Sequence, residues 1–225
     1  MTRAAALAAS PQWPVSRRAL LLGGAFVAAG AGLAGFPRPA HAGAQIEEPL
    51  ADAVRTALSA AIANSAPPVP DFSTTAAYIT YLRWLTVMSD RLYKRIRNFT
   101  ARTEFLQTAW YESHRAGLQT SLVLGLIQVE SNFRKFAISR AGALGYMQVM
   151  PFWTRQIGNG DPDTLFHMQA NLRFGCVILR YYLDRERGNL FMALGRYNGS
   201  RGQRQYPSAV LGAQKRWLYA PDLNL

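Results

Sequence analysis

The chain is poor in the residues that build disulfide frameworks and metal sites. One cysteine in 225 residues excludes an internal disulfide and any cysteine-rich zinc module. The three histidines show no HExxH spacing, so we expect no metal site. The glycine-rich patterns GxGxxG and GxxxxGK[ST] are absent as well, and the sequence therefore predicts no nucleotide or other cofactor.

Acidic residues are also scarce in this sequence. Thirteen Asp and Glu face 25 Lys and Arg, which gives a formal net charge of +12. Such an excess indicates an anionic partner, either an acidic polymer, an acidic lipid surface or a nucleic acid. Hydrophobic residues make up 49% of the chain, enough to bury one sizeable core.

The first 42 residues predict an export signal that is not part of the fold. Seventeen apolar or small residues, 19–35, follow Arg17-Arg18 and lead to an A-x-A cleavage pattern that ends at Ala42. Five glycines weaken this stretch as a membrane span, although a retained anchor stays an alternative. The arginine pair favours twin-arginine over Sec export. Cleavage near Ala42 would remove four arginines and no acid, leaving a periplasmic protein with a charge of +8.

The remaining chain predicts an all-α fold with at most a short hairpin. Apolar residues at helical spacing predict helices over 46–64, 78–99, 102–115, 118–133, 171–183 and 190–197. The glycine-containing segment 139–148 is expected to form a loop or a short hairpin, and the proline-rich run 66–71 a linker. We divide the chain into the signal (1–42), an N-terminal helical extension (43–102) and a C-terminal domain (103–225).

Glu130 is the most informative single residue. Helical spacing places it on the apolar stripe that includes Leu122 and Phe133. A carboxyl group in apolar surroundings without a cation has a raised pKa and can act as a general acid near neutral pH. The alternative is a glutamate at a helix end that reaches solvent or pairs with Arg134 or Arg140.

Two downstream segments carry side chains typical of a sugar site. Gln148 lies between Met147 and Met150, and Tyr197-Asn198 precedes a glycine. Aromatic faces can stack on pyranose rings, while amides can bond to hydroxyl and acetamido groups. Each segment alone is also typical of ordinary structure, since methionines often fill cores and Asn-Gly often forms turns.

Taken in order, three segments resemble the soluble lytic transglycosylase family, which is related to goose-type lysozymes. They are Glu130-Ser-Asn-Phe133, Gly142-Ala-Leu-Gly-Tyr-Met-Gln-Val-Met-Pro151 and Tyr197-Asn-Gly-Ser200. The resemblance covers roughly residues 108–211. It departs from the family pattern at Tyr146, where Leu is usual, and at Ser200, where a small residue such as Gly is usual. It implies a lysozyme-like SLT catalytic domain behind the N-terminal helical extension.

The resemblance implies a peptidoglycan lytic transglycosylase in which Glu130 is the sole catalytic acid/base. The reaction cleaves the β-1,4 bond between N-acetylmuramic acid and N-acetylglucosamine without water and leaves a 1,6-anhydromuramoyl end. Substrate-binding roles would fall to Ser131, Gln148, Met150, Tyr197 and Asn198. The motifs contain one carboxylate, so the substrate's own 6-hydroxyl or acetamido group must do part of the work. Asp163 stays open as a second carboxylate; its alternative is a helix N-cap.

The expected partner is the glycan strand of peptidoglycan. Further expectations are service to an envelope-spanning secretion apparatus and peripheral contact with an anionic membrane. The contact would be made by the late basic group, which consists of Arg196, Arg201, Arg204, Lys215 and Arg216. We expect no nucleic-acid partner, because the basic residues are dispersed and the chain is exported. Two alternatives remain, a muramidase-type hydrolase on the same scaffold and a non-catalytic wall-binding protein.

Overall fold

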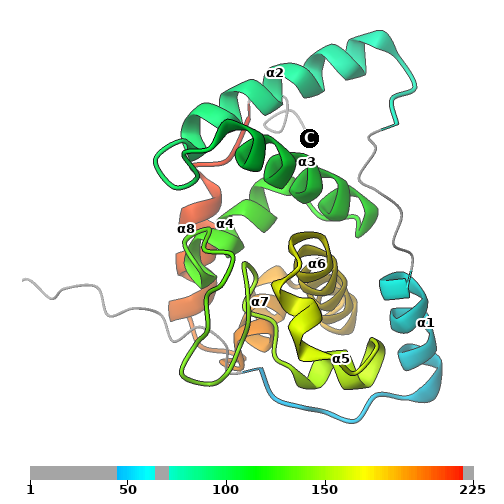
Figure 1. Cartoon of the computed structure of the whole chain (residues 1–225). Helices are drawn as coiled ribbons and strands as arrows, with labels where there is room; N and C mark the ends of the chain where they lie inside the picture. The colour runs from blue at the N-terminus through cyan, green and yellow to red at the C-terminus, as the bar shows by residue number, and fades with distance from the viewer. Residues whose placement is uncertain (1–44, 64–70, 220–225) are drawn as a thin grey trace, which may run out of the picture. The chain divides into compact units, whose positions relative to one another are not determined.

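The computed structural model describes residues 45–63 and 71–219, which are mainly helical (Figure 1). The elements are α1 (Asp52–Ala63), α2 (Thr75–Leu92), α3 (Phe99–Arg115), α4 (Thr120–Glu130), α5 (Phe152–Ile157), the 3-10 helix η1 (Pro162–Phe166), α6 (Met168–Arg185), α7 (Leu190–Asn198) and α8 (Gln205–Gln214). Within those ranges there is no strand, only isolated bridges that pair Leu144 with Ile138 and with Val149. The predicted all-α class with a short hairpin at most is confirmed. The predicted signal and most of the predicted linker lie outside the described residues.

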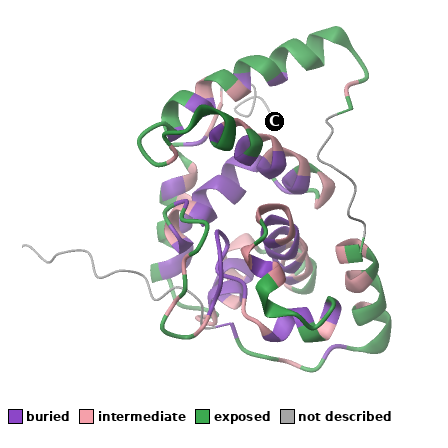
Figure 2. Cartoon of the chain, in the orientation of Figure 1, coloured by how far each residue is buried: buried purple, intermediate pink, exposed green. Residues whose placement is uncertain are grey.

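Helix α4 lies at the centre of the core. Its residues 120–127 are all buried, and it packs against α3 and α8 (Figure 2). Gly125 permits the close approach to α8, because a Cβ there would lie 2.7 Å from the backbone nitrogen of Gln214. Helix α6 contributes the buried Leu172, Cys176 and Leu179 to the same core, as the apolar stripe of this helix predicts.

The predicted helix over 46–64 is wrong at its start, since α1 begins only at Asp52. Pro49 explains the difference: it lacks a backbone N–H and disfavours helical backbone at the residue before it. The segment before α1 instead contacts the core. Oε1 of the buried Gln45 accepts a hydrogen bond of 2.9 Å from the indole N–H of Trp153.

The single long helix expected over 78–99 is also wrong. Helix α2 ends at Leu92, and α3 begins at Phe99, three residues earlier than predicted. The side chain of Asn98 accepts a hydrogen bond from the backbone N–H of Ala101, so a strong N-cap residue starts a new helix here. Thr74 caps α2 in the same way, since its side chain accepts a hydrogen bond from the backbone N–H of Ala77.

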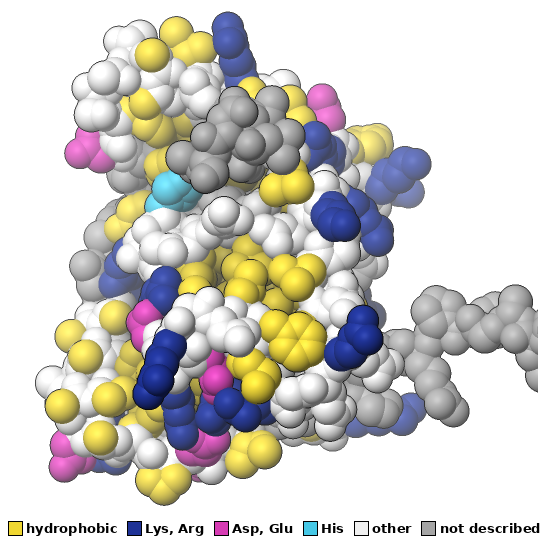
Figure 3. Space-filling model, turned by 180° about the vertical axis from the view of Figure 1, so that it is seen from behind, with side chains coloured by type: hydrophobic (Ala, Val, Ile, Leu, Met, Phe, Trp, Pro, Cys, Tyr) yellow, Lys and Arg dark blue, Asp and Glu magenta, His cyan; other side chains and the backbone are white. Residues whose placement is uncertain are grey.

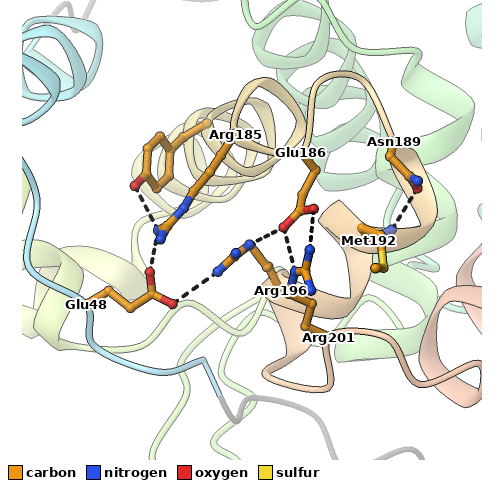
Figure 4. A network of polar contacts seen from close by, with 8 residues as sticks. Glu48, Arg185, Glu186, Asn189, Met192, Arg196 and Arg201 are labelled. Atoms are coloured by element: carbon orange, nitrogen blue, oxygen red, sulfur yellow. Dashed lines mark hydrogen bonds and ion pairs between the residues drawn. The ribbon is translucent and has the colours of Figure 1, made fainter.

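A network of ion pairs joins the N-terminal segment to α6 and α7 (Figure 4). Glu48 accepts hydrogen bonds from Arg185 and Arg196, and Glu186 accepts them from Arg196 and Arg201. The hydrogen bond from Arg201 is the main reason why the pKa of Glu186 falls to about 2. Two arginines of the late basic group are therefore already paired with carboxylates.

All of the described helices belong to one compact unit. The boundary between an extension and a domain at residue 102 stays a prediction. None of the helices in the described part of the chain combines the length and the apolar composition needed to cross a bilayer.

Candidate functional site

Glu130 is the last residue of α4, yet its residue surface is only 6% exposed. Within the described residues it forms no ion pair. The guanidinium of Arg134 turns instead to the backbone carbonyl of Ser131, at 3.0 Å. Neither alternative for Glu130, an open helix end or an arginine partner, describes the structure.

The carboxyl group of Glu130 has one hydrogen-bond partner, the phenol of Tyr206. Tyr206 Oη donates to Glu130 Oε1 at 2.5 Å, and both side chains are buried. Desolvation raises the pKa of Glu130 to about 8, although the hydrogen bond from Tyr206 lowers it in part. Most of the Glu130 population therefore carries a proton at neutral pH, as a general acid requires.

Burial also raises the pKa of Tyr206, and the charge of Glu130 raises it further. The phenol therefore remains a proton-bearing donor across the physiological range. The second carboxyl oxygen, Glu130 Oε2, is buried and has no hydrogen-bond partner within the described residues. Tyr206 thus fixes Oε1, whereas Oε2 remains able to form a hydrogen bond with a bound molecule.

Side-chain hydrogen bonds fix the loop between α4 and α5 beside this acid. Ser131 Oγ donates to the carbonyl of Tyr146 at 2.7 Å. The buried amide of Asn171 accepts from the N–H of Met147 at 2.8 Å and donates to the carbonyl of Leu144 at 2.9 Å. Gly145 is required there, because a Cβ would lie 2.3 Å from Asn171 Nδ2. The first two motifs are thereby joined next to Glu130.

Gln148 and Met150 both help to hold this loop. Gln148 has a left-handed backbone (φ 50°), and its amide nitrogen donates to the carbonyls of Gly145 at 2.9 Å and Ala137 at 3.1 Å. Met150 is half-buried, and its backbone N–H donates to Gln45 Oε1 at 3.4 Å. The amide that we expected to face a sugar is thus largely engaged with the backbone.

The third motif ends α7 and contacts the second. Tyr197 is fully buried and donates its hydroxyl hydrogen to the carbonyl of Met147 at 2.8 Å. Asn198 Nδ2 donates to Ser200 Oγ at 3.0 Å, whereas Asn198 Oδ1 is buried without a partner among the described residues. The phenol that reaches Glu130 is that of Tyr206, which the sequence reasoning missed. The signal available for it was the stripe Tyr206, Val210 and Ala213 along α8, all of them buried.

Asp163 lies in an exposed position of η1. Its backbone N–H donates to Asp161 Oδ1 at 2.9 Å, so the N-cap is Asp161 and not Asp163 as we expected. Among the described acids only Glu112 and Glu130 are buried, and Glu112 pairs with Arg173 at 3.0 Å. Of these two buried acids, Glu130 is the one that forms no ion pair within the described residues.

A cavity of about 660 Å³ lies away from this site, between α2 and the start of α4. Its lining includes Trp84, Trp110 and Gln119 but not Glu130. Because Glu130 ends α4, the length of the helix places the acid roughly 16 Å from this cavity. The two are separate features of the molecule.

The three motifs and the buried acid lie within a segment that matches one known family. Residues 108–219 match the family model of the transglycosylase SLT domain, and the chain belongs to that family through this segment. The resemblance inferred from the three motifs is confirmed.

Curated relatives carry the name membrane-bound lytic murein transglycosylase C. The protein of Haemophilus ducreyi is 32% identical over 122 residues, 49% of this chain and 30% of the relative. Those of Haemophilus influenzae and Glaesserella parasuis are 30% and 36% identical over 40% and 32% of this chain. The matches span 29% and 22% of these two relatives, so the chain corresponds to less than a third of each relative's length.

The X-ray structure of an inactive mutant of lytic transglycosylase Slt from Pseudomonas aeruginosa aligns with a TM-score of 0.47 and 20% sequence identity. The alignment covers 83% of this chain and 38% of that chain.

Proposed function

We propose that this protein is a peptidoglycan lytic transglycosylase with Glu130 as its single acid/base. The observation that carries the proposal is a buried carboxyl group without a cation partner, held by Tyr206 inside an SLT domain. The curated relatives of this segment are named as lytic murein transglycosylases, which supports the same reaction class.

The proposed reaction needs one carboxyl group in two protonation states. Glu130, protonated at neutral pH, donates its proton to the oxygen of the β-1,4 bond as the bond from this oxygen to the anomeric carbon breaks. The resulting carboxylate then accepts the proton of the muramoyl 6-hydroxyl, whose oxygen bonds to the anomeric carbon. The proton returns to Glu130, no water is consumed, and the product is a 1,6-anhydromuramoyl end.

Tyr206 supports this cycle because it can donate to either form of the acid. Its hydrogen bond to Oε1 leaves Oε2 as the oxygen that exchanges the proton with substrate. Asn198 Oδ1, also buried and unpartnered among the described atoms, is suited to accept from a hydroxyl or acetamido N–H of the sugar. The other expected site residues act in this proposal mainly by fixing the loop that borders Glu130; they are Ser131, Gln148, Met150 and Tyr197.

The hydrolase alternative would need a carboxylate that activates water or attacks the sugar. Among the described residues no second carboxylate contributes to the raised pKa of Glu130, and Asp163 is exposed in η1. A single-acid mechanism is therefore favoured over a two-carboxylate hydrolase. The raised pKa of Glu130 favours catalysis over a purely wall-binding role, which needs no acid.

We propose that the protein works in the periplasm after cleavage near Ala42 and that its partner is the glycan strand. The names of the curated relatives, which place them at a membrane, support an envelope location. On the face drawn in Figure 3, Lys and Arg side chains alternate with acidic and apolar ones rather than forming one basic surface. Contact with an anionic membrane or a secretion apparatus stays a prediction.

Product analysis on purified sacculi tests the proposal. The wild-type protein should release muropeptides with anhydro ends, which mass spectrometry distinguishes from hydrolytic ends by the mass of one water. Glu130→Gln should bind sacculi but release no soluble product. Reducing ends in the wild-type digest would establish hydrolysis instead, and unchanged turnover by Glu130→Gln would remove Glu130 from the mechanism.

A further inference from the structure

The turn that follows Glu130 has an unusual backbone. Asn132 and Phe133 are consecutive non-glycine residues with left-handed φ angles of 49° and 64°. Asparagine tolerates this region, but a bulky residue such as phenylalanine rarely adopts it, so surrounding contacts must hold the turn. This turn directly follows the acid and sets the direction in which the chain leaves α4.

Arg95 supplies such contacts from the turn between α2 and α3. Its Nε donates to Asn132 Oδ1 at 2.9 Å. Its guanidinium carbon lies 5.5 Å from the ring centroid of Phe133 and 5.8 Å from that of Trp217, both within cation–π range. One side chain therefore contacts both left-handed residues and the aromatic ring that packs beside them.

Trp217 connects the same group to the other side of Glu130. It is buried against Phe133, with ring centroids 5.1 Å apart, and its indole N–H donates to Gln128 Oε1 at 3.0 Å. Arg91, one turn before Arg95, donates to the carbonyls of Arg216 and Leu218, which flank Trp217. The residues two before and two after Glu130 are thus both held by this cluster.

We propose that Arg95 is a positioning residue that holds the Asn132–Phe133 turn and thereby keeps the Glu130 carboxyl buried against Tyr206. Arg95 lies outside the segment 108–219 that matches the SLT family model, so this role assigns a function at the site to the preceding helices. The expected effect of Arg95 on kcat rests on the proposed function, whereas its expected effect on the position of Glu130 does not.

Arg95 acts by holding the turn and not by placing its positive charge beside the Glu130 carboxyl. The titratable groups that face Glu130 are Tyr206 on α8, which donates to it, and Tyr197 on α7, whose pKa it raises. Arg95 bonds to the side chain of Asn132 instead. Loss of Arg95 should therefore loosen the turn, admit water to Glu130 and lower its pKa from about 8 toward the usual value of 4.5.

The test compares Arg95→Met with Arg97→Met in the full mature chain. Arg97 is an exposed arginine of the same turn, so the two changes are chemically matched. Arg95→Met should lower kcat on sacculi by about 10-fold, keep KM within about twofold and move the alkaline limb of kcat to lower pH. Arg97→Met should leave all three unchanged. Arg95→Lys, which keeps the charge and loses the planar donor, should lie between wild type and Arg95→Met, and it decides the question if Arg95→Met does not fold.

A double-mutant cycle and a titration complete the test. Glycine adopts left-handed backbone freely, so Asn132→Gly should reduce the effect of Arg95→Met on kcat to less than about twofold. The carboxyl pKa of Glu130, assigned by ¹³C NMR against Glu130→Gln, should fall in Arg95→Met but not in Arg97→Met.

These measurements separate the two proposals. If wild type releases nothing from sacculi, the proposed function fails, and the NMR titration alone decides the role of Arg95. If Arg95→Met lowers only the melting temperature, with kcat, pH profile and Glu130 pKa as in wild type, Arg95 is merely structural and the inference is overturned.

Discussion

The phenol of Tyr206 lies 2.5 Å from Glu130 Oε1, although 76 residues separate them in the sequence. The contact exists because α4 and α8 pack closely at Gly125, which brings the start of α8 to the end of α4. It fixes one oxygen of a carboxyl group whose pKa burial raises to about 8. The catalytic proposal and several tests of it depend on this pair.

Tyr206→Phe removes the donor to Glu130 and keeps the ring. Because this hydrogen bond lowers the pKa of Glu130, its loss should raise that pKa further and move the alkaline limb of kcat to higher pH. We expect kcat to fall by about 10-fold, since the acid loses its fixed orientation. Tyr93→Phe, at an exposed position, is the control and should leave the pH profile unchanged. An unshifted alkaline limb in Tyr206→Phe would contradict the prediction.

The pH dependence of stability should report the buried proton on Glu130. Its pKa is about 8 in the folded protein and 4.5 in model compounds, so folding strengthens proton binding. This contribution to the free energy of unfolding is fully present below pH 4.5 and is lost as the pH rises through about 8. The shift corresponds to at most about 5 kcal/mol.

Glu130→Gln carries no titrating group at this position. Between about pH 6 and about pH 9 it should therefore lose less stability than wild type, because only wild type loses a bound proton in this range. Thermal melts of both proteins across this range measure the difference. Parallel curves would show that Glu130 is not buried in solution.

Gly125→Ala should separate α4 from α8. The added methyl would lie 2.7 Å from the backbone of Gln214, which cannot move alone, so we expect a loss of about 1–3 kcal/mol in stability. Activity should fall as well, because α8 carries Tyr206. Gly212→Ala on α8 meets nothing within 4 Å and should be neutral or stabilise by up to about 1 kcal/mol. Chemical denaturation and sacculus release measure both variants, and equal stabilities for the two alanine variants would contradict the close packing.

Glu112→Gln should destabilise the fold without acting on the acid. Glu112 and Arg173 form a buried ion pair at 3.0 Å between α3 and α6. Removing one partner leaves the other charge buried, with a typical cost of about 3–5 kcal/mol. Asp52→Asn breaks the exposed pair of Asp52 with Arg55 and should cost less than about 1 kcal/mol. Similar unfolding midpoints in urea for the two variants would show that the Glu112 pair is solvated.

The sequence predicted much of the core and the acid, because both depend on local periodicity. The apolar stripe of α4 places Glu130 among buried residues, and the apolar spacing over 171–183 predicts the buried face of α6. Single residues within an apolar pattern can shift the end of a helix. Pro49 delays the start of α1, and Asn98 begins a new helix inside an otherwise continuous apolar pattern.

The contacts that complete the site could not be predicted from local patterns. Tyr206 lies on the buried face of α8, and its partner is determined by how α8 packs against α4. The roles of Gln148 and Arg95 depend on left-handed turns that no propensity for these residues indicates. Such features follow from tertiary packing, which overrides local preference.

The hydrogen bond from Trp153 to Gln45 has a practical consequence for anyone shortening this protein. A recombinant fragment limited to residues 108–219 would contain the acid and all three motifs. It would also leave the buried indole of Trp153 without its acceptor Gln45, and Arg185 and Arg196 without their shared partner Glu48. Phe133 would lose the guanidinium of Arg95 that lies over its ring. Fragment boundaries for crystallisation or assays are better placed upstream of Gln45.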